Sequence, residues 1–276
     1  MDIRVIATDM DGTLLDSQGR YPKERFEKLL ESLEKRGIRL VIATGNHLSR
    51  MRLLFGDLMG RLSFVAANGT VLVEQGRVFS QRFWTRAMVQ DCLAYFHGKL
   101  RSYHVIVGME EQNIALEGTD FSYVYQLVSR ESAEGFLSRI QYVASFDDLP
   151  LGNYLRVSLM LKEAEVEDVI RQFNQTFQGR FVAVTSGYGS VDILETGIHK
   201  AWGLEQLLTR WDMSASQLMA FGDSNNDVEM LELAAYSYAM DNGDEAAKLA
   251  ANALAPTNDQ AGVLQVIENY LKDGEK

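Results

Sequence analysis

The sequence predicts an α/β fold built on a doubly wound parallel sheet, with a second α/β domain inserted into it. Toward both ends of the chain, short apolar runs with the composition of strands alternate with segments whose apolar residues recur at helical spacing. This alternation is typical of a Rossmann-like parallel sheet with crossover helices. The length of 276 residues also favours two domains, at about 150 residues for each. We therefore assign residues 1–83 and 187–276 to the core domain and residues 84–186 to the inserted domain.

The core domain opens with an apolar run from Ile3 to Thr8, which has the composition of a buried strand. A helix follows, because four apolar residues recur at i, i+3, i+4 and i+7: Phe26, Leu29, Leu30 and Leu33. A hairpin is predicted over residues 70–74 and 77–81. After the insertion, a helix that begins at Lys200 and a strand over residues 217–221 resume the alternation.

From about Trp84 the pattern changes, and the segment mixes helical spacing with alternating strands. The predicted helices and strands cover residues 86–99, 103–107, 121–128, 155–161 and 163–177. The segment contains none of the four polar motifs described below, so we interpret it as a separate lid. The run Gly187-Tyr188-Gly189 is a candidate hinge by which the chain returns to the core domain.

The first motif is Asp9-Met10-Asp11-Gly12-Thr13, directly after the first apolar run. Open α/β sheets bind ligands at the carboxyl ends of their strands, where this motif places two carboxylates. A carboxylate can attack phosphorus and form an aspartyl-phosphate, which makes Asp9 the candidate nucleophile. The reaction also needs a group that protonates the leaving alkoxide and later accepts a proton from water, and Asp11 suits this role. Gly12 lets the chain turn away from the strand.

The second and third motifs supply groups that bind phosphate. Thr44-Gly45 ends the apolar run Val41-Ile42-Ala43, and it offers a hydroxyl and backbone N–H groups to a phosphate oxygen. Lys200 follows Gly197-Ile198-His199, and its ammonium can neutralise phosphate as a point charge. We expect His199 to be a packing or supporting residue. In isolation each of these segments also suits an ordinary loop or a surface lysine.

The fourth motif, Gly222-Asp223-Ser224-Asn225-Asn226-Asp227, follows another apolar run. Clustered carboxylates repel one another unless a cation joins them, and Mg²⁺ prefers hard oxygen ligands. Asp9, the backbone carbonyl of Asp11 and Asp223 would supply the protein ligands, and Asp227 would orient them. Alone, the string also suits a loop that caps a helix.

The net charge and the cysteine content indicate which binding partners and which cellular compartment to expect. A net charge of −11 argues against nucleic acid and anionic membranes as partners. The one cysteine, Cys92, lies in a predicted helix and cannot form an internal disulfide, which favours a reducing compartment. The sequence shows neither a signal-peptide pattern nor an apolar run of membrane-spanning length. We expect a cytoplasmic protein that binds a small phosphorylated metabolite, as a monomer or a weak homodimer.

In this order, the four motifs resemble those of the haloacid dehalogenase superfamily, in particular its Cof-type phosphatases and, among them, bacterial sugar phosphatases. The resemblance covers nearly the whole chain and implies a C2-type cap inserted into the core. It also implies that Asn226 binds phosphate together with Thr44 and Lys200, and that Asp223 is a metal ligand supported by Asp227. Many members carry Arg where this chain has Asn46, so the resemblance implies that a guanidinium from this position is missing.

We therefore predict a Mg²⁺-dependent phosphatase that acts on small phosphorylated metabolites, sugar phosphates foremost, through phospho-Asp9. A phosphomutase or phosphotransferase would use the same motifs and pass the phosphoryl group to a second sugar. A dehalogenase would need neither Asp11 nor a metal, so the sequence argues against it. A non-catalytic regulatory module whose Asp9 is phosphorylated as a signal is the alternative from a different class.

Overall fold

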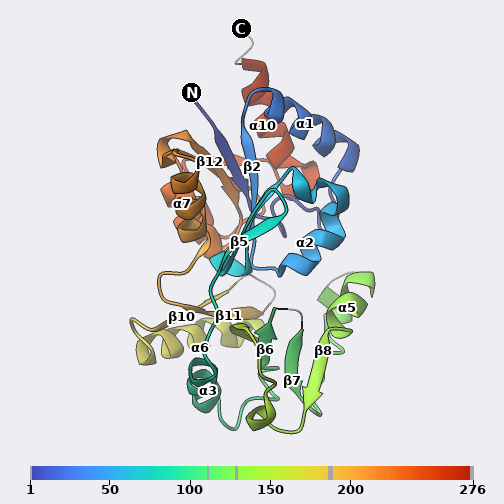
Figure 1. Ribbon diagram of the computed structural model, residues 1–276, viewed down its shortest axis with the longest axis vertical. Coiled ribbons are helices and arrows are strands. Elements are labelled where there is room, and N and C mark those ends of the chain that lie inside the picture. The colour runs from blue at the N-terminus through green and yellow to red at the C-terminus, as the bar shows by residue number, and fades with distance from the viewer. Residues whose placement is uncertain (1, 111, 128–129, 186–188, 274–276) are drawn as a thin grey trace. The chain divides into compact units, whose positions relative to one another are not determined.

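The computed structural model describes residues 2–110, 112–127, 130–185 and 189–273, which divide into two units (Figure 1). Unit 1 comprises Met1–Gln81 and Ile198–Lys276, and unit 2 comprises Arg82–Gly197. Each unit has its own sheet and its own buried apolar core.

Unit 1 contains an eight-stranded sheet in the order β14-β13-β12-β1-β2-β3-β4-β5. The strands from β14 to β3 are parallel, and the hairpin strands β4 and β5 are antiparallel to their neighbours. The strands span β1 Val5–Thr8, β2 Arg39–Ala43, β3 Ser63–Ala66, β4 Val71–Glu74, β5 Arg77–Gln81, β12 Leu218–Gly222, β13 Tyr236–Met240 and β14 Ala253–Ala255. The predicted hairpin is thus present.

Helices cover both faces of this sheet, as Figure 1 shows for α7 on one side and α1, α2 and α10 on the other. Leucines of α7 pack with alternate strand residues such as Val5 and Val65. On the opposite face Phe64 of β3 contacts Phe55 of α2, whose ring also contacts Phe26 of α1. The helices of unit 1 are α1 Lys23–Lys35, α2 Leu48–Phe55, α7 Lys200–Arg210, α8 Val228–Leu233, α9 Glu245–Ala250 and α10 Gly262–Asp273. The predicted doubly wound α/β class is confirmed.

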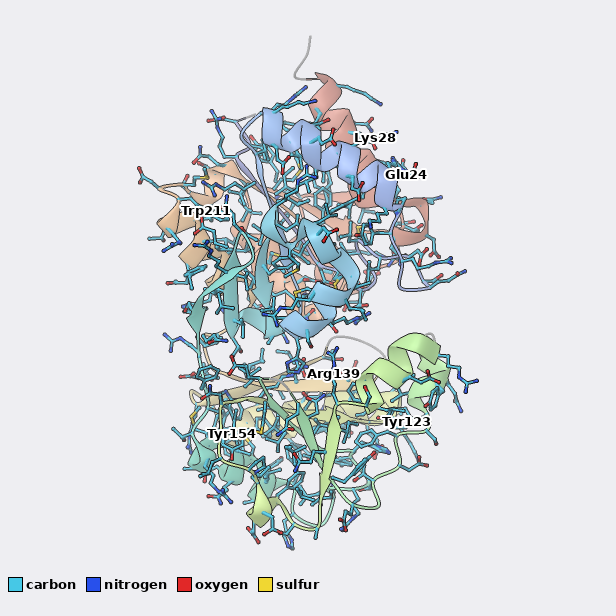
Figure 2. The ribbon with its side chains drawn as sticks, turned by 45° about the vertical axis from the view of Figure 1, so that its right-hand side comes forward. Glu24, Lys28, Tyr123, Arg139, Tyr154 and Trp211 are labelled. Atoms are coloured by element: carbon cyan, nitrogen blue, oxygen red, sulfur yellow. The ribbon has the colours of Figure 1, made fainter. Side chains whose placement is uncertain are left out.

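The helix α1 shows why the apolar spacing predicted it. Its four periodic residues are all buried: Phe26, Leu29, Leu30 and Leu33. Glu24 and Lys28 project from its opposite, exposed side (Figure 2). The apolar stripe therefore packs the helix against the sheet, and positions on the exposed side can carry polar residues.

Unit 2 contains a six-stranded sheet in the order β10-β11-β9-β6-β7-β8, in which only the β7–β8 pair is parallel. The strands span β6 Ile106–Met109, β7 Asn113–Leu116, β8 Ile140–Val143, β9 Tyr154–Met160, β10 Phe181–Thr185 and β11 Ser190–Glu195. Helices α3 Arg86–Tyr95 and α6 Glu163–Thr176 bury their apolar residues, Cys92 among them, in the main core of this unit. The short helices α4 Val124–Leu127 and α5 Arg130–Leu137 belong to a smaller core.

The structure corrects several predicted boundaries. Residues 190–195 were assigned to the core domain, but they form β11, which pairs with β9 and β10 in the sheet of unit 2. The predicted boundary between residues 186 and 187, and the hinge residues Gly187 and Tyr188, lie outside the described residues. The helix predicted over residues 86–99 ends at Tyr95, and Gly98 follows with a φ of +83°. The strand predicted from residue 103 begins at Ile106, after His104 with a φ of +48°.

Across the described ranges, the helices fall short of the combined length and apolarity that crossing a membrane requires.

Candidate active site

The site lies at the carboxyl ends of three neighbouring parallel strands, β12, β1 and β2. Asp223 follows β12, Asp9 follows β1 and Thr44 follows β2. The order of strands reverses at β1, because β2 and β3 lie on one side of it and β12 to β14 lie on the other. Open α/β sheets bind ligands at such a switch point. The topology therefore brings together motifs that are about two hundred residues apart.

Gly12 packs the loop after Asp9 closely against Asp223. Its φ is +77°, and a Cβ atom at this position would lie 2.4 Å from Asp223 Oδ2. The next residue, Thr13, donates a hydrogen bond of 2.6 Å from its hydroxyl to Asp223 Oδ1. Residues with a side chain rarely adopt such a backbone conformation, and here there is also no room for one. Glycine is therefore required for both reasons.

Substitution of Gly12 by Ala is expected to destabilise the protein more than the same substitution at Gly19. The two glycines have similar φ values of +77° and +74°, so each variant incurs a similar backbone cost of about 1–2 kcal/mol. No described atom lies within 4 Å of the added methyl group at Gly19, whereas at Gly12 it overlaps Asp223. Urea titrations would give both free energies of unfolding. Equal losses would contradict the close packing of Gly12.

Asp9, Asp223 and Asp227 form a cluster of carboxylates. One oxygen of each lies within 4.8 Å of the others, and Asp9 and Asp227 are buried. Asp227 Oδ2 accepts hydrogen bonds from the backbone N–H groups of Asp223 at 3.0 Å and Ser224 at 3.2 Å. Asp227 thus fixes the backbone that carries Asp223.

Lys200 enters this cluster from the first turn of α7. His199 is the N-cap of the helix, and its Nδ1 accepts a hydrogen bond of 3.2 Å from the N–H of Trp202. Two glycines allow close approach of the helix: a Cβ atom at Gly69 would lie 2.5 Å from the carbonyl oxygen of His199, and one at Gly203 would lie 2.5 Å from Val65 Cγ1. His199 is therefore a capping residue that helps to place the lysine beside it.

The Lys200 ammonium is 1% exposed and bridges two of the carboxylates. Its Nζ lies 2.8 Å from Asp9 Oδ1 and 2.6 Å from Asp227 Oδ1. The structure thus brings together Asp9, Lys200, Asp223 and Asp227, as the sequence analysis predicted.

Burial and neighbouring charges shift the pKa values of the groups in this cluster. Burial raises the pKa of Asp9 well above its usual value, and the Lys200 ammonium opposes this effect only in part. Burial also raises the pKa of Asp223 to about 7, and repulsion from Asp227 adds to it. Burial acts to lower the pKa of Lys200, but the Asp227 and Asp9 carboxylates outweigh it and hold that pKa above its usual value. Three carboxyl groups thus share one ammonium, and the protein disfavours the ionised form of two of them when no cation is bound.

A divalent cation fits this donor set. The cluster offers hard carboxylate oxygens that converge within 4.8 Å, and Mg²⁺ binds one or two carboxylates together with substrate phosphate and water. Burial is the main reason that the pKa values of Asp9 and Asp223 are raised, and repulsion from the neighbouring carboxylates adds to it; a bound cation would offset that repulsion. The residues present are therefore suited to holding Mg²⁺.

Asp11 lies outside the carboxylate cluster and belongs to a second network with Thr44. Asn46 Nδ2 donates to Asp11 Oδ2 at 2.6 Å and to Thr44 Oγ1 at 2.9 Å. The guanidinium of Arg50 donates to both oxygens of Asp11. Sequence analysis missed Arg50, because an arginine in an amphipathic helix is usually a solvated residue. A guanidinium is thus present in this network, from position 50 and not from position 46.

Asn68 connects the two remaining phosphate-binding candidates, Gly45 and Asn226. It is 1% exposed, and its Oδ1 accepts a hydrogen bond of 3.1 Å from Asn226 Nδ2. A Cβ atom at Gly45 would lie 3.2 Å from Asn68 Nδ2. Ala67 and Asn68 have φ values of +48° and +53°, which turn the asparagine into the site. The Asn-Gly pair at 68–69 is the sequence signal for such a turn.

The C-terminal part of the chain also fixes the loop that carries Asp9. Asn242 Nδ2 donates to the carbonyl of Gly12 at 2.8 Å, and Asn258 Nδ2 donates to the carbonyl of Leu15 at 2.9 Å. A Cβ atom at Gly243 would lie 2.8 Å from the carbonyl oxygen of Asp223. The loops that carry Asp9 and Asp223 both contact residues between 242 and 258.

Comparison with known proteins gives consistent results over nearly the whole chain. A family model described as haloacid dehalogenase-like hydrolase matches residues 6–267. The chain is 34% identical over 276 residues to the Escherichia coli 5-amino-6-(5-phospho-D-ribitylamino)uracil phosphatase YbjI, which covers 99% of this chain and 97% of that protein. It is 26% identical over 271 residues to a Bacillus subtilis phosphatase of the same name, YitU, with 96% and 97% covered. The crystal structure of SMU.1108c from Streptococcus mutans aligns with a TM-score of 0.89 and 36% identity, over 98% of this chain and 99% of that one.

Proposed function

Because this chain belongs to the haloacid dehalogenase-like hydrolase family and is a phosphatase, we propose that it hydrolyses small phosphate monoesters of polyhydroxylated metabolites, sugar phosphates foremost, with Mg²⁺. The observation that carries the proposal is the contact of the buried Asp9 carboxylate with the Lys200 ammonium, inside a cluster of carboxylates. This arrangement offers a nucleophile and a fixed positive charge at one place.

In the proposed reaction, Asp9 attacks phosphorus, and the bond between phosphorus and the alcohol oxygen breaks. Asp11 protonates the leaving alkoxide. Water then attacks the phosphorus of phospho-Asp9 while the Asp11 carboxylate accepts its proton, which releases phosphate and restores Asp9. Lys200, Thr44 with the N–H groups after it, and Asn226 would hold the phosphoryl oxygens, where positioning and charge supply most of the catalysis.

Mg²⁺ would be held by Asp9, the backbone carbonyl of Asp11 and Asp223, with Asp227 orienting the backbone of Asp223. When bound, the ion would neutralise charge on the transferring phosphoryl group. Without it, an incoming phosphate dianion would meet a cluster of three carboxyl groups with the Lys200 ammonium bonded to two of them.

The substrate class is proposed from two lines of support. The motif resemblance points to sugar phosphates, and two relatives are named as phosphatases of a ribityl phosphate. A sugar phosphate and a ribityl phosphate share a phosphate ester on a polyhydroxylated carbon chain. Unit 2 contains none of the phosphate-handling residues, which supports the proposal that it selects the organic part of the substrate.

A screen of phosphorylated metabolites, ranked by kcat/KM, tests the proposal. We expect release of inorganic phosphate from sugar phosphates or from the ribitylaminouracil phosphate, loss of activity on chelation, and recovery with Mg²⁺. Full activity in EDTA, with no metal found by elemental analysis, would overturn the metal assignment. Phosphoryl transfer to a second sugar would identify a phosphomutase or phosphotransferase. A stable phospho-Asp9 without turnover would identify a regulatory module.

A further inference from the structure

The carboxylate of Asp11 accepts hydrogen bonds from two residues of one short segment of the chain. Arg50 Nη2 lies 2.6 Å from Asp11 Oδ1, and Arg50 Nη1 lies 2.9 Å from Asp11 Oδ2. Asn46 Nδ2 donates to Asp11 Oδ2 at 2.6 Å, and Asn46 Oδ1 accepts from Arg50 Nη1 at 2.7 Å. The three residues therefore form a closed ring of hydrogen bonds, which we name the Asp11 clamp.

The geometry of the clamp fixes both the position and the rotation of the carboxylate. A guanidinium is a rigid, planar fork that matches the two oxygens of a carboxylate, whereas an ammonium binds as a single point charge. Arg50 lies in α2, and its Nη1 also donates to Asn46 Oδ1. The Asn46 amide in turn donates to Thr44 Oγ1 at 2.9 Å. The carboxylate is thus aligned relative to the phosphate-binding loop after β2.

The number of donors matters for proton transfer. A carboxylate has about four lone-pair directions, and the bonds from Arg50 and Asn46 occupy three of them. The remaining direction, on Oδ1, is the one open to a further hydrogen bond. The clamp therefore leaves one defined direction of the Asp11 carboxylate for contact with the leaving oxygen or with water.

We infer that Arg50 is a positioning residue that orients Asp11 for its acid and base steps. The inference rests on the function proposed above. Arg50 acts through Asp11 and not on the phosphoryl group. Its removal should therefore affect the steps that need a proton more strongly than phosphate binding or the attack by Asp9.

The test compares Arg50→Ala, Arg50→Lys and the control Arg52→Ala, which removes an exposed arginine from the same helix. For an alkyl phosphate we expect Arg50→Ala to lower kcat by about 10²-fold, the lower range of general acid catalysis, with KM nearly unchanged. For 4-nitrophenyl phosphate, whose leaving group needs little protonation, the loss should stay within a few fold. Arg50→Lys should recover little, since an ammonium cannot engage both oxygens. Arg52→Ala should match the unmodified protein on both substrates.

Chemical rescue supplies a second readout. Guanidinium ion at millimolar concentration should restore the activity of Arg50→Ala toward the alkyl phosphate, and methylammonium should not. Equal losses on the two substrates, or a loss that appears mainly in KM, would overturn the inference and identify Arg50 as a phosphate-binding or purely structural residue.

A crystal structure of Arg50→Ala keeps the inference testable if the proposed function itself fails. The Asp11 side chain is expected to leave the orientation seen here and to become disordered or to rotate. An unchanged Asp11 would overturn the positioning role whatever the activity. Absence of turnover by the unmodified protein, together with a displaced Asp11 in the variant, would overturn the proposed function and leave the clamp supported.

Discussion

Replacement of Asp9 by Asn is expected to lower kcat by about 10⁴-fold or more, which corresponds to at least ~5.5 kcal/mol of activation free energy. An amide retains the shape of the side chain but cannot attack phosphorus, so the covalent route is closed. The variant is expected to fold, because burial already disfavours the charged form of Asp9 and a neutral amide removes that cost.

Steady-state kinetics with a sugar phosphate would measure the loss of kcat, and thermal unfolding would show whether the variant still folds. Asp57→Asn is a suitable control, because it makes the same chemical change at an exposed residue. Residual activity above about a tenth of the unmodified value, a barrier change of only ~1.4 kcal/mol, would show that Asp9 is not the nucleophile. A variant that failed to fold would contradict the expected tolerance of a neutral side chain here.

Replacement of Lys200 by Met is expected to cost about 3–5 kcal/mol of folding free energy and to abolish turnover, because it leaves buried carboxylates without their cation. Lys200 bonds both Asp9 and Asp227, and all three side chains are at most 8% exposed. Methionine fills a similar volume, so loss of packing contributes little. The same change at Lys28, an exposed residue of α1 (Figure 2), should alter the free energy of unfolding by less than about 0.5 kcal/mol.

A double-mutant cycle that combines Lys200→Met with Asp227→Asn separates the contribution of the Lys200 charge from that of its packing. If unpaired charge causes the loss, Asp227→Asn should restore part of the stability when it is combined with Lys200→Met, although it is destabilising alone. Urea unfolding measured without metal gives the free energies needed. Additive losses would show that Lys200 contributes through packing and not through its charge.

The proximity of Asp9 and Asp223 could be predicted because each follows a strand of the parallel sheet, and Asp227 is four residues beyond Asp223. Lys200 begins α7 and follows no strand of this sheet, so strand order does not account for its position. Parallel strands end at the same edge of a sheet, so polar residues that follow buried apolar runs converge there. The spacing of Phe26 and Leu33 predicted α1 for a similarly general reason, since one apolar stripe must face the sheet.

Other features depend on contacts that residue types do not encode. In the sequence Arg50 cannot be told from any other arginine of a helix, and its contact with Asp11 is seen only in the folded chain. Asn68 contacts Asn226 from a left-handed backbone conformation, which its residue type does not determine. Residues 190–195 were placed in the core domain without a predicted strand, whereas they form β11 in the sheet of unit 2, because the residue pattern of a segment does not show which sheet it joins. The role of Asp11 as an acid and base stays a prediction.

The place of β1 between β2 and β12 has a consequence for synthesis of the protein on the ribosome. The edge of β1 that pairs with β12 has no partner until residue 218 has been made, and the whole of unit 2 is translated first. At typical translation rates of about 5–20 residues per second, residues 82–217 take roughly 7–27 s. During that interval the nascent chain presents an apolar strand edge, the kind of surface on which chains aggregate and chaperones act. The loop that carries Asp9 lacks two of its hydrogen-bond partners for longer still, because Asn242 and Asn258 are translated after β12.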